Sequence, residues 1–490
     1  MTAQLSPEPV TEQPERPAGG MFGGHPRALL PIWGVAMWDF VSFWGMQAIL
    51  MMYMIMGLGI AKPTAMGVMG AYMGLGFLVT VLAGLVSDRL LGQERTLLWS
   101  AILVMLGHIC LSLIPGIPGL VAGLVGVGLG SGGIKAAGVS TLGTFYAEGD
   151  ERRYAGFSLF YFGLNLGAFA GPIVTGLVQG KWGFHAGFMT AGVGMALGLV
   201  MYFALRKDVR TPETMTVKNP LGPNEMWKPV AVLVGIVAAA SVLWMTGLLH
   251  PGNLSTWVAI TAATLAVAYF SRILTSARTS DVEKSRLKAY IPLWVSSVLF
   301  WSLFMQIFTV LPVYAEGRVD FNIFGWTMPL AWIFSINPVW VIIMATVFAW
   351  LWARLDDRAP VAALKFAIAL VVLGVAYLCF IPFAGGGKGT VPLLAIVGIL
   401  FLFSVGELLI SPVGMALVTK LAPQNWKTQT VGVFFLSPAI GSALAGVIGQ
   451  RYSPDNEVVY FGFLGVAAIV VGLLIAGAAK TLTRLMGGVR

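Results

Sequence analysis

The stretch YAEGDERRYAGFSLFYFGLNLGAFAGPIVTG, residues 146–176, shows how the chain is built. Its first third is polar and charged, and the remainder is almost wholly apolar apart from Asn165. A charged turn followed by about 20 apolar residues predicts a loop that leads into a membrane-spanning helix. Because hydrocarbon offers Asn165 no hydrogen-bond partner, we expect its side chain to face other helices or a water-filled cavity.

The composition extends this prediction to the whole chain. The 490 residues are 57% hydrophobic and 10% charged, whereas a soluble domain carries about 25% charged residues. We therefore predict an all-α polytopic membrane protein, because a β-barrel would show short alternating segments instead of long apolar runs. Cys110 and Cys379 both lie in apolar runs, so no disulfide framework is expected. The net charge of +9 comes from basic residues scattered through short loops, and we expect no nucleic-acid partner.

The apolar runs predict fourteen membrane-spanning helices, in groups of six, two and six. They lie at about 30–57, 64–87, 97–116, 118–145, 155–179, 184–205, 229–249, 253–275, 290–314, 326–353, 360–384, 391–419, 430–450 and 458–478. The expected organisation is a disordered cytoplasmic tail (1–27), a six-helix bundle (28–206), a linker with two extra transmembrane helices (207–288), a second six-helix bundle (289–479) and a cytoplasmic tail (480–490).

The loop charges predict the orientation. With the N-terminus inside, most arginines and lysines fall in the inner loops, and the outer loops hold only Lys181, Arg318, Lys388 and Arg451. An even number of helices returns the C-terminus to the same side. Residues 1–20 have no apolar core, so we expect no signal peptide and place the chain in the cell (inner) membrane with both termini cytoplasmic.

Two motifs resemble the proton-dependent oligopeptide transporter family of the major facilitator superfamily. Gly156-Phe157 and FYFGLNLG at 160–167 match that family's G-F and F-Y-x-x-I-N-x-G, with Leu164 in place of isoleucine. The turn GLVSDRLLGQER at 84–95 resembles the superfamily's loop between helices two and three. The resemblance implies two six-helix bundles with the extra helix pair of the bacterial fourteen-helix branch, and a substrate site between the bundles near the midplane.

Few charged residues lie deep in predicted helices, where each costs roughly 2.5–3.5 kcal/mol and needs a reason. Lys135 lies in GLGSGGIKAAGVSTL (128–142) and matches the family's helix-four lysine, which implies contact with a substrate carboxylate and a part in proton coupling. Glu407 lies in FLFSVGELLISPVGMAL (401–417), where Ser411 completes the family's E-x-x-x-S-P pattern. The resemblance implies that Glu407 contacts a peptide amino group and pairs with Lys135. The alternatives are a snorkelling lysine and a purely structural pair.

Asn165 and Asn337 are neutral hydrogen-bonding groups at depth. The resemblance implies that both contact the peptide backbone and termini, and the alternative is that they join neighbouring helices. Pro338 follows Asn337 in the run at 326–353, which is helix eight when the two linker helices are not counted. We expect Pro338 to break this helix where a cavity could form.

The first helix departs from the family motif E-x-x-E-R-F-S-Y-Y-G-M-R. Residues 36–47 read AMWDFVSFWGMQ, so Asp39 keeps an acid, Phe43 and Trp44 stand at the two tyrosines, and Gln47 stands where an arginine would help to hold a peptide carboxylate. Phe40 replaces the other arginine. Asp39, Phe43 and Gln47 share one helical face, which supports a cavity-facing Asp39, although a polar contact to a neighbouring helix is the alternative.

Three more aligned positions lose polar groups. Met305 stands where the family commonly has an acid, Phe77 at its helix-two tyrosine and Phe434 at its helix-eleven tryptophan. Two explanations stay open: a pocket that favours more apolar or differently charged ligands than ordinary di- and tripeptides, or simplified coupling through Asp39 and Glu407. Because Glu407 is expected to pair with Lys135, we expect coupling to run mainly through Asp39.

The sequence therefore predicts a secondary active transporter that couples proton entry to symport of small peptides or peptide-like compounds. The alternative is a related carrier with an altered substrate or weakened coupling. We expect no enzymatic activity and no metal or cofactor, because paired His or Cys ligands and a phosphate-binding loop are absent from the sequence. The expected partners are a substrate, protons and lipid, and we expect a monomer.

Overall fold

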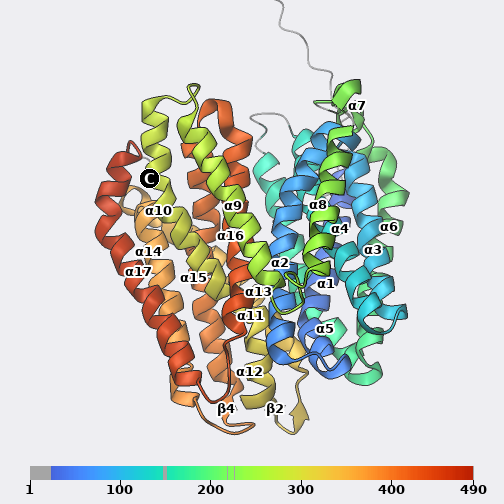
Figure 1. Cartoon of the computed structure of the whole chain (residues 1–490), viewed down its shortest axis with the longest axis vertical. Helices are drawn as coiled ribbons and strands as arrows, with labels where there is room; N and C mark the ends of the chain where they lie inside the picture. Colours follow the sequence, from blue (N-terminus) through green and yellow to red (C-terminus); the bar gives the residue numbers. More distant parts are fainter. Residues whose placement is uncertain (1–23, 147–149, 151, 218, 226, 489–490) are drawn as a thin grey trace, which may run out of the picture.

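The computed structural model describes residues 24–146, 150, 152–217, 219–225 and 227–488, so the tail expected at 1–27 lies almost wholly outside the described residues. Within the described ranges, fourteen helices are long and apolar enough to cross a membrane. This confirms the predicted all-α membrane fold. Figure 1 shows the helices running roughly side by side along the long axis.

The first six membrane-spanning segments form the N-terminal bundle, in which two helices end in a π-helical turn. They are α1 (Leu29–Met52) with η1 (Tyr53–Gly57), α2 (Lys62–Val86) with η2 (Ser87–Leu91), α3 (Gln93–Leu113), α4 (Gly116–Thr144), α5 (Arg152–Trp182) and α6 (Phe184–Val209). Within this bundle α1 packs against α5 and α6, and α3 packs against α4.

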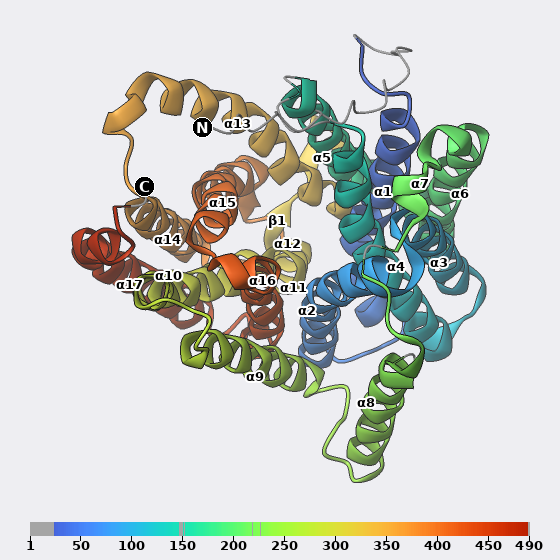
Figure 2. The same ribbon diagram turned by 90° about the horizontal axis from the view of Figure 1, so that it is seen from above.

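The linker contributes the two extra spans. Its elements are α7 (Pro212–Met215), η3 (Pro223–Glu225), α8 (Trp227–Met245) and α9 (Leu254–Thr275). No described residue of α8 is buried, and Figure 2 shows this helix standing away from the two bundles. In contrast, α9 packs against α2 and α16, so it touches both bundles.

The last six spans form the C-terminal bundle. Its helices are α10 (Asp281–Phe304), α11 (Gln306–Thr309), α12 (Leu311–Arg318), η4 (Leu330–Ser335), α13 (Ile336–Leu355), η5 (Asp356–Arg358), α14 (Ala362–Leu378), η6 (Ile381–Phe383), α15 (Leu393–Leu421), η7 (Gln424–Trp426), α16 (Lys427–Gly449) and α17 (Glu457–Leu485). Two short strand pairs lie at one end of the molecule: β1 (Val319–Asp320) runs parallel to β4 (Val391–Pro392), and β2 (Asn322–Ile323) runs antiparallel to β3 (Trp326–Thr327). We call this end the β end and the opposite one, which carries α7, the α7 end (Figure 1).

Helix seven, counted without the two linker helices and made of α10, α11 and α12, differs from its prediction as one span over 290–314. It begins at Asp281, because the Ser280 hydroxyl accepts from the Glu283 backbone N–H and the Glu283 carboxylate accepts from the Ser280 backbone N–H in a capping box. It is then interrupted at Met305 and Val310. Pro312 lies just beyond the second interruption, and proline in a helix has no N–H to donate and clashes with the carbonyl four residues earlier.

Helix eight also starts later than predicted. β3 and an extended segment occupy the first expected residues, a 3₁₀ turn follows over Leu330–Ser335, and α-helix begins at Ile336. The expected break at Pro338 is wrong, because Pro338 lies in the first turn of α13, where proline is tolerated. At the end of the chain α17 continues to Leu485, so the region expected as a tail from 480 onward starts as helix.

The two bundles meet closely at two places. On α2 and α16, a Cβ added to Gly70 would lie 2.5 Å from the Gly446 Cα, so the two helix backbones are nearly in contact. Nearer the β end, the Ser335 hydroxyl donates to the Phe169 carbonyl (2.7 Å) and the Trp332 indole donates to the Ile173 carbonyl (3.2 Å). These bonds join the start of helix eight to the second half of α5.

Candidate functional site

Lys135 sits on α4, which is rich in glycine on the faces it turns to its neighbours. A Cβ added to Gly130 would lie 2.5 Å from the Ser100 carbonyl oxygen, and one added to Gly132 would lie 2.7 Å from Val79 Cγ1. Only glycine allows α4 to come this close to α3 and α2. This packing fixes the helix that carries Lys135, whose own side chain is partly accessible.

The ammonium group of Lys135 is held by aromatic rings and an acid of the same bundle. It lies 4.2 Å from the centre of the Phe43 ring and 5.7 Å from that of Phe40. The Asp39 carboxylate lies nearby on α1, because it accepts a hydrogen bond from Ser131, one turn before Lys135 on α4. Cation–π contact and a nearby carboxylate both favour the charged ammonium away from water. The N-terminal bundle therefore compensates its own deep cation.

Asp39 is fully buried, with an exposed fraction of 0%. Its Oδ2 accepts a hydrogen bond from the Ser131 hydroxyl at 3.0 Å, and its Oδ1 has no hydrogen-bond partner. The Tyr72 hydroxyl lies within its electrostatic reach and is also buried without a partner. Asp39 thus contacts a neighbouring helix, which was the alternative to a cavity-facing position. Ser131 and Tyr72 were not predicted, because both lie far from Asp39 in the sequence and only the packing of the helices brings them near it.

The other first-helix candidates take different positions. Phe43 and Trp44 are partly accessible, and the Trp44 ring lies 5.2 Å from the Phe308 ring of the other bundle. Gln47 is 1% exposed and its Oε1 has no partner. Asp39, Phe43 and Gln47 were expected on one cavity-facing stripe, but only Phe43 presents accessible surface.

Glu407 sits on α15 in the C-terminal bundle, beside the start of helix eight. Its Oε2 accepts a hydrogen bond from Asn337 Nδ2 at 3.3 Å, and the same amide nitrogen donates to the Ser404 hydroxyl at 2.9 Å. Glu407 is partly accessible, and no cation among the described residues pairs with it. Ser404, one turn before Glu407, was not predicted, whereas the predicted Ser411 is partly accessible one turn after it.

Asn165 and Tyr161 face this carboxylate from the N-terminal bundle. Asn165 Nδ2 donates to the Tyr161 carbonyl at 3.0 Å. The Tyr161 side chain is 56% exposed and lies in the electrostatic field of Glu407. Both residues keep accessible surface. Tyr161 belongs to the sequence motif at 160–167, but it was not expected to contribute to the site.

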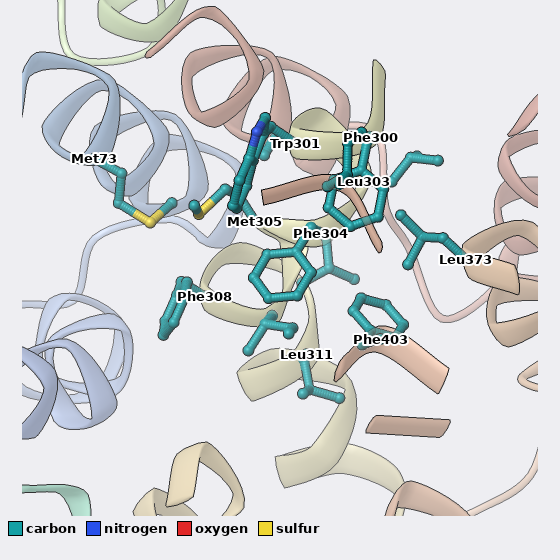
Figure 3. Close-up of a cluster of buried hydrophobic side chains, with 14 of the residues drawn as sticks. Met73, Phe300, Trp301, Leu303, Phe304, Met305, Phe308, Leu311, Leu373 and Phe403 are labelled. Carbon is teal, nitrogen blue, oxygen red and sulfur yellow. The ribbon is translucent and has the colours of Figure 1, made fainter. Parts of the chain in front are cut away.

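The wall contributed by helix seven is apolar. Trp301, Phe304, Met305 and Phe308 are all buried, and Figure 3 shows Trp301 and Met305 pointing toward Met73 of α2. Phe304 also contacts Phe403 of α15, with ring centres 5.9 Å apart. The acid expected at the position of Met305 is thus replaced by a thioether inside a hydrophobic cluster.

Two predicted aromatic residues have mainly packing contacts. Phe434 is 7% exposed and packs beside Phe435, with ring centres 5.4 Å apart. A Cβ added to Gly414 of α15 would lie 2.8 Å from the Phe434 ring, so the ring fits against that glycine. Phe77 is partly buried against the main apolar core.

The expected pair of Lys135 with Glu407 is not formed in this structure. Lys135 belongs to the N-terminal bundle with Asp39, and Glu407 belongs to the C-terminal bundle with Asn337. The reason is packing: α1 and α4 contact each other directly, which brings Asp39 and Ser131 within hydrogen-bond distance. Within the described residues, no group of three or more His, Cys, Asp or Glu side chains could hold a metal ion.

Comparison with known proteins adds three findings. The family model PTR2, described as the POT family, matches residues 94–458. The uncharacterized transporter YclF of Bacillus subtilis is 34% identical over 96% of this chain and 97% of its own, and a di-/tripeptide transporter of Lactococcus lactis subsp. cremoris is 30% identical over 96% and 98%. A crystal structure of a mutant peptide transporter POT in complex with alafosfalin superposes with a TM-score of 0.91 at 37% identity, over 96% of this chain and 97% of that one.

Proposed function

The chain belongs to the POT family of multi-pass membrane transporters, and on this premise we propose that it carries small peptides or peptide-like compounds across the membrane by alternating access. The resemblance of its motifs to this family had predicted the same membership. Its fold is that of the major facilitator superfamily, with two six-helix bundles and a two-helix linker.

One observation carries the proposal: partly accessible amide side chains of α5 and of the start of α13, Asn165 and Asn337, lie within about one turn of the Ser335–Phe169 hydrogen bond that joins the two bundles. Glu407 and Asn337 belong to the C-terminal bundle, and Lys135 and Asn165 belong to the N-terminal bundle. A carboxylate is the natural partner of a peptide ammonium group, and amide side chains can donate to and accept from a peptide backbone. A ligand that contacts both bundles can stabilise one relative arrangement of the bundles over another.

We further propose that this conformation opens the site toward the α7 end. The hydrogen bonds of Ser335 and Trp332 to α5 hold the bundles together toward the β end. Tyr161 and Tyr154, nearer the start of α5, are 56% and 84% exposed. The excess of loop Arg and Lys favours the α7 end as the cytoplasmic side, so the state is inward-open, with both termini in the cytoplasm and the chain in the inner membrane.

A proton gradient is the proposed driving force, as in the family. Glu407 is the acid best placed to exchange a proton with the accessible space, because it is partly exposed and has no cation partner among the described residues. Protonation of Glu407 would change the charge of the site and with it the relative stability of the two bundle arrangements, so a proton carried with the substrate can bias the transport cycle. No bound cofactor is needed for this scheme.

Counterflow in proteoliposomes tests the proposal. Vesicles that contain the purified protein and unlabelled dialanine should take up external labelled dialanine faster than protein-free vesicles. Excess trialanine should compete for this uptake, whereas excess free alanine should not. Absence of counterflow with every di- and tripeptide tried would contradict the proposal.

A further inference from the structure

From the charges of the site, we propose that it prefers singly cationic ligands whose carboxyl end is uncharged, such as amides or esters of small apolar peptides, over zwitterionic free peptides. The inference rests on the proposed function, since it concerns the ligand of the same site. It goes further by assigning a ligand class from the way that Asp39, Lys135 and Glu407 are partnered.

Three charged side chains lie deep inside the described spans, and they are not equivalent. Lys135 and Asp39 have opposite charges and lie near each other in the N-terminal bundle: Asp39 accepts from Ser131, one turn before Lys135, and Lys135 lies over Phe43, one turn after Asp39. Glu407 has only the neutral partner Asn337 and keeps accessible surface. The site therefore presents one uncompensated negative charge, which a single ammonium group on the ligand neutralises.

A free peptide brings a carboxylate as well as an ammonium group. That carboxylate must either stay without a cation in the site or form an ion pair with Lys135 in place of Asp39. The second course leaves Asp39 unpaired where it is fully buried, with Oδ1 already lacking a hydrogen bond. An unpaired buried charge is strongly unfavourable, so either course weakens binding of the free acid.

The surroundings of Lys135 suit an uncharged group. The Lys135 ammonium lies over the Phe40 and Phe43 rings, and the Trp44 ring packs at an interplanar angle of 36° against Phe308 of the opposite bundle. Gln47, the neighbouring polar residue of α1, is buried and carries no charge. A carboxamide or ester next to an apolar side chain can pack on these rings without displacing a charge.

Binding of three ligands to the purified unmodified protein tests this inference. The probes are alanyl-phenylalanine, its C-terminal amide and N-acetyl-alanyl-phenylalanine, compared by isothermal titration calorimetry at one pH and ionic strength. The amide should bind about ten-fold more tightly than the free acid, and the N-acetylated acid should bind most weakly. Equal or tighter binding of the free acid would overturn the inference while leaving peptide transport intact. If neither the free acid nor the amide binds, the proposed function falls with it.

Two substitutions locate the cause of the preference. Glu407→Gln should reduce the affinity for the amide by about ten-fold or more, whereas Glu316→Gln, the same change at a partly accessible residue that pairs with Lys388 at the β end, should not. Phe40→Arg adds a cation beside Asp39 and frees Lys135, so it should increase the affinity for the free acid. An unchanged ratio of amide to free-acid affinity in both Glu407→Gln and Phe40→Arg would also overturn the inference.

Discussion

Asp39 on α1 and Lys135 on α4 carry opposite charges and lie near each other inside one bundle, because Ser131, one turn before Lys135, donates a 3.0 Å hydrogen bond to the Asp39 carboxylate. This pair leaves Glu407 of the opposite bundle without a cation among the described residues. The two sides of the site therefore differ in charge.

The Asp39–Lys135 pair can be tested by a double-mutant cycle. Lys135→Met should lower the melting temperature because Asp39 stays buried without its cation, at a cost of about 3 kcal/mol. Asp39→Asn combined with Lys135→Met should recover most of that loss, since no unpaired charge remains. The melting temperatures of the four proteins in detergent measure the coupling. Additive losses in the double variant would show that the two groups do not interact.

Glu407 is expected to be essential for concentrative uptake. Glu407→Gln cannot gain or lose a proton, so this variant should insert and purify but fail to accumulate substrate in gradient-driven uptake. Glu316→Gln serves as the control and should accumulate substrate like the unmodified protein. Normal accumulation by Glu407→Gln would contradict this assignment. Asp39, the proton carrier predicted from the sequence, would then be expected to couple transport, and Asp39→Asn would lose accumulation.

Two glycines of α2 offer a matched test of how closely the bundles approach. Gly70→Val should destabilise the protein by about 1–3 kcal/mol or block transport, because a Cβ at Gly70 would lie 2.5 Å from the Gly446 Cα. Gly76→Val should have little effect, since no heavy atom lies within 4 Å of a Cβ built there. Thermal stability and counterflow of both variants measure the difference. Equal effects would mean that the α2–α16 contact does not limit the fold or transport.

The orientation is testable by cysteine labelling in intact cells. With Cys110 and Cys379 replaced by alanine, Lys388→Cys at the β end should react with a membrane-impermeant maleimide added outside. Arg278→Cys at the α7 end should react only after the cells are permeabilised. Both positions are exposed in the structure, so accessibility within the protein does not distinguish them. The reverse labelling pattern would invert the proposed topology.

The membrane-spanning plan could be predicted from the sequence because apolar runs report the helices directly. Most helix limits agree with the prediction within a few residues. The exceptions depend on local chemistry: the Ser280 capping box starts α10 early, and interruptions at Met305 and Val310 divide helix seven. The residues of β3 look apolar enough to be helical, but they pair with β2 instead.

The partners of the site residues were harder to predict than the residues themselves. Lys135, Glu407 and Asn337 were identified from their depth and motif, but the pairing of Lys135 with Asp39 depends on the rotation and spacing of α1 and α4. A motif along one helix carries no information about that geometry. For the same reason Tyr161 was not expected in the site, although it lies one turn before Asn165.

Gradient-driven accumulation in proteoliposomes tests the central claim most directly. Vesicles that contain the protein but no substrate should be diluted into a buffer whose pH is lower than the internal pH. The buffer contains labelled dialanine or its amide. Proton-coupled symport predicts that internal substrate rises above the external concentration, and that a protonophore returns it to equilibrium. Uptake that stops at equal concentrations with or without the pH gradient would contradict proton-coupled transport.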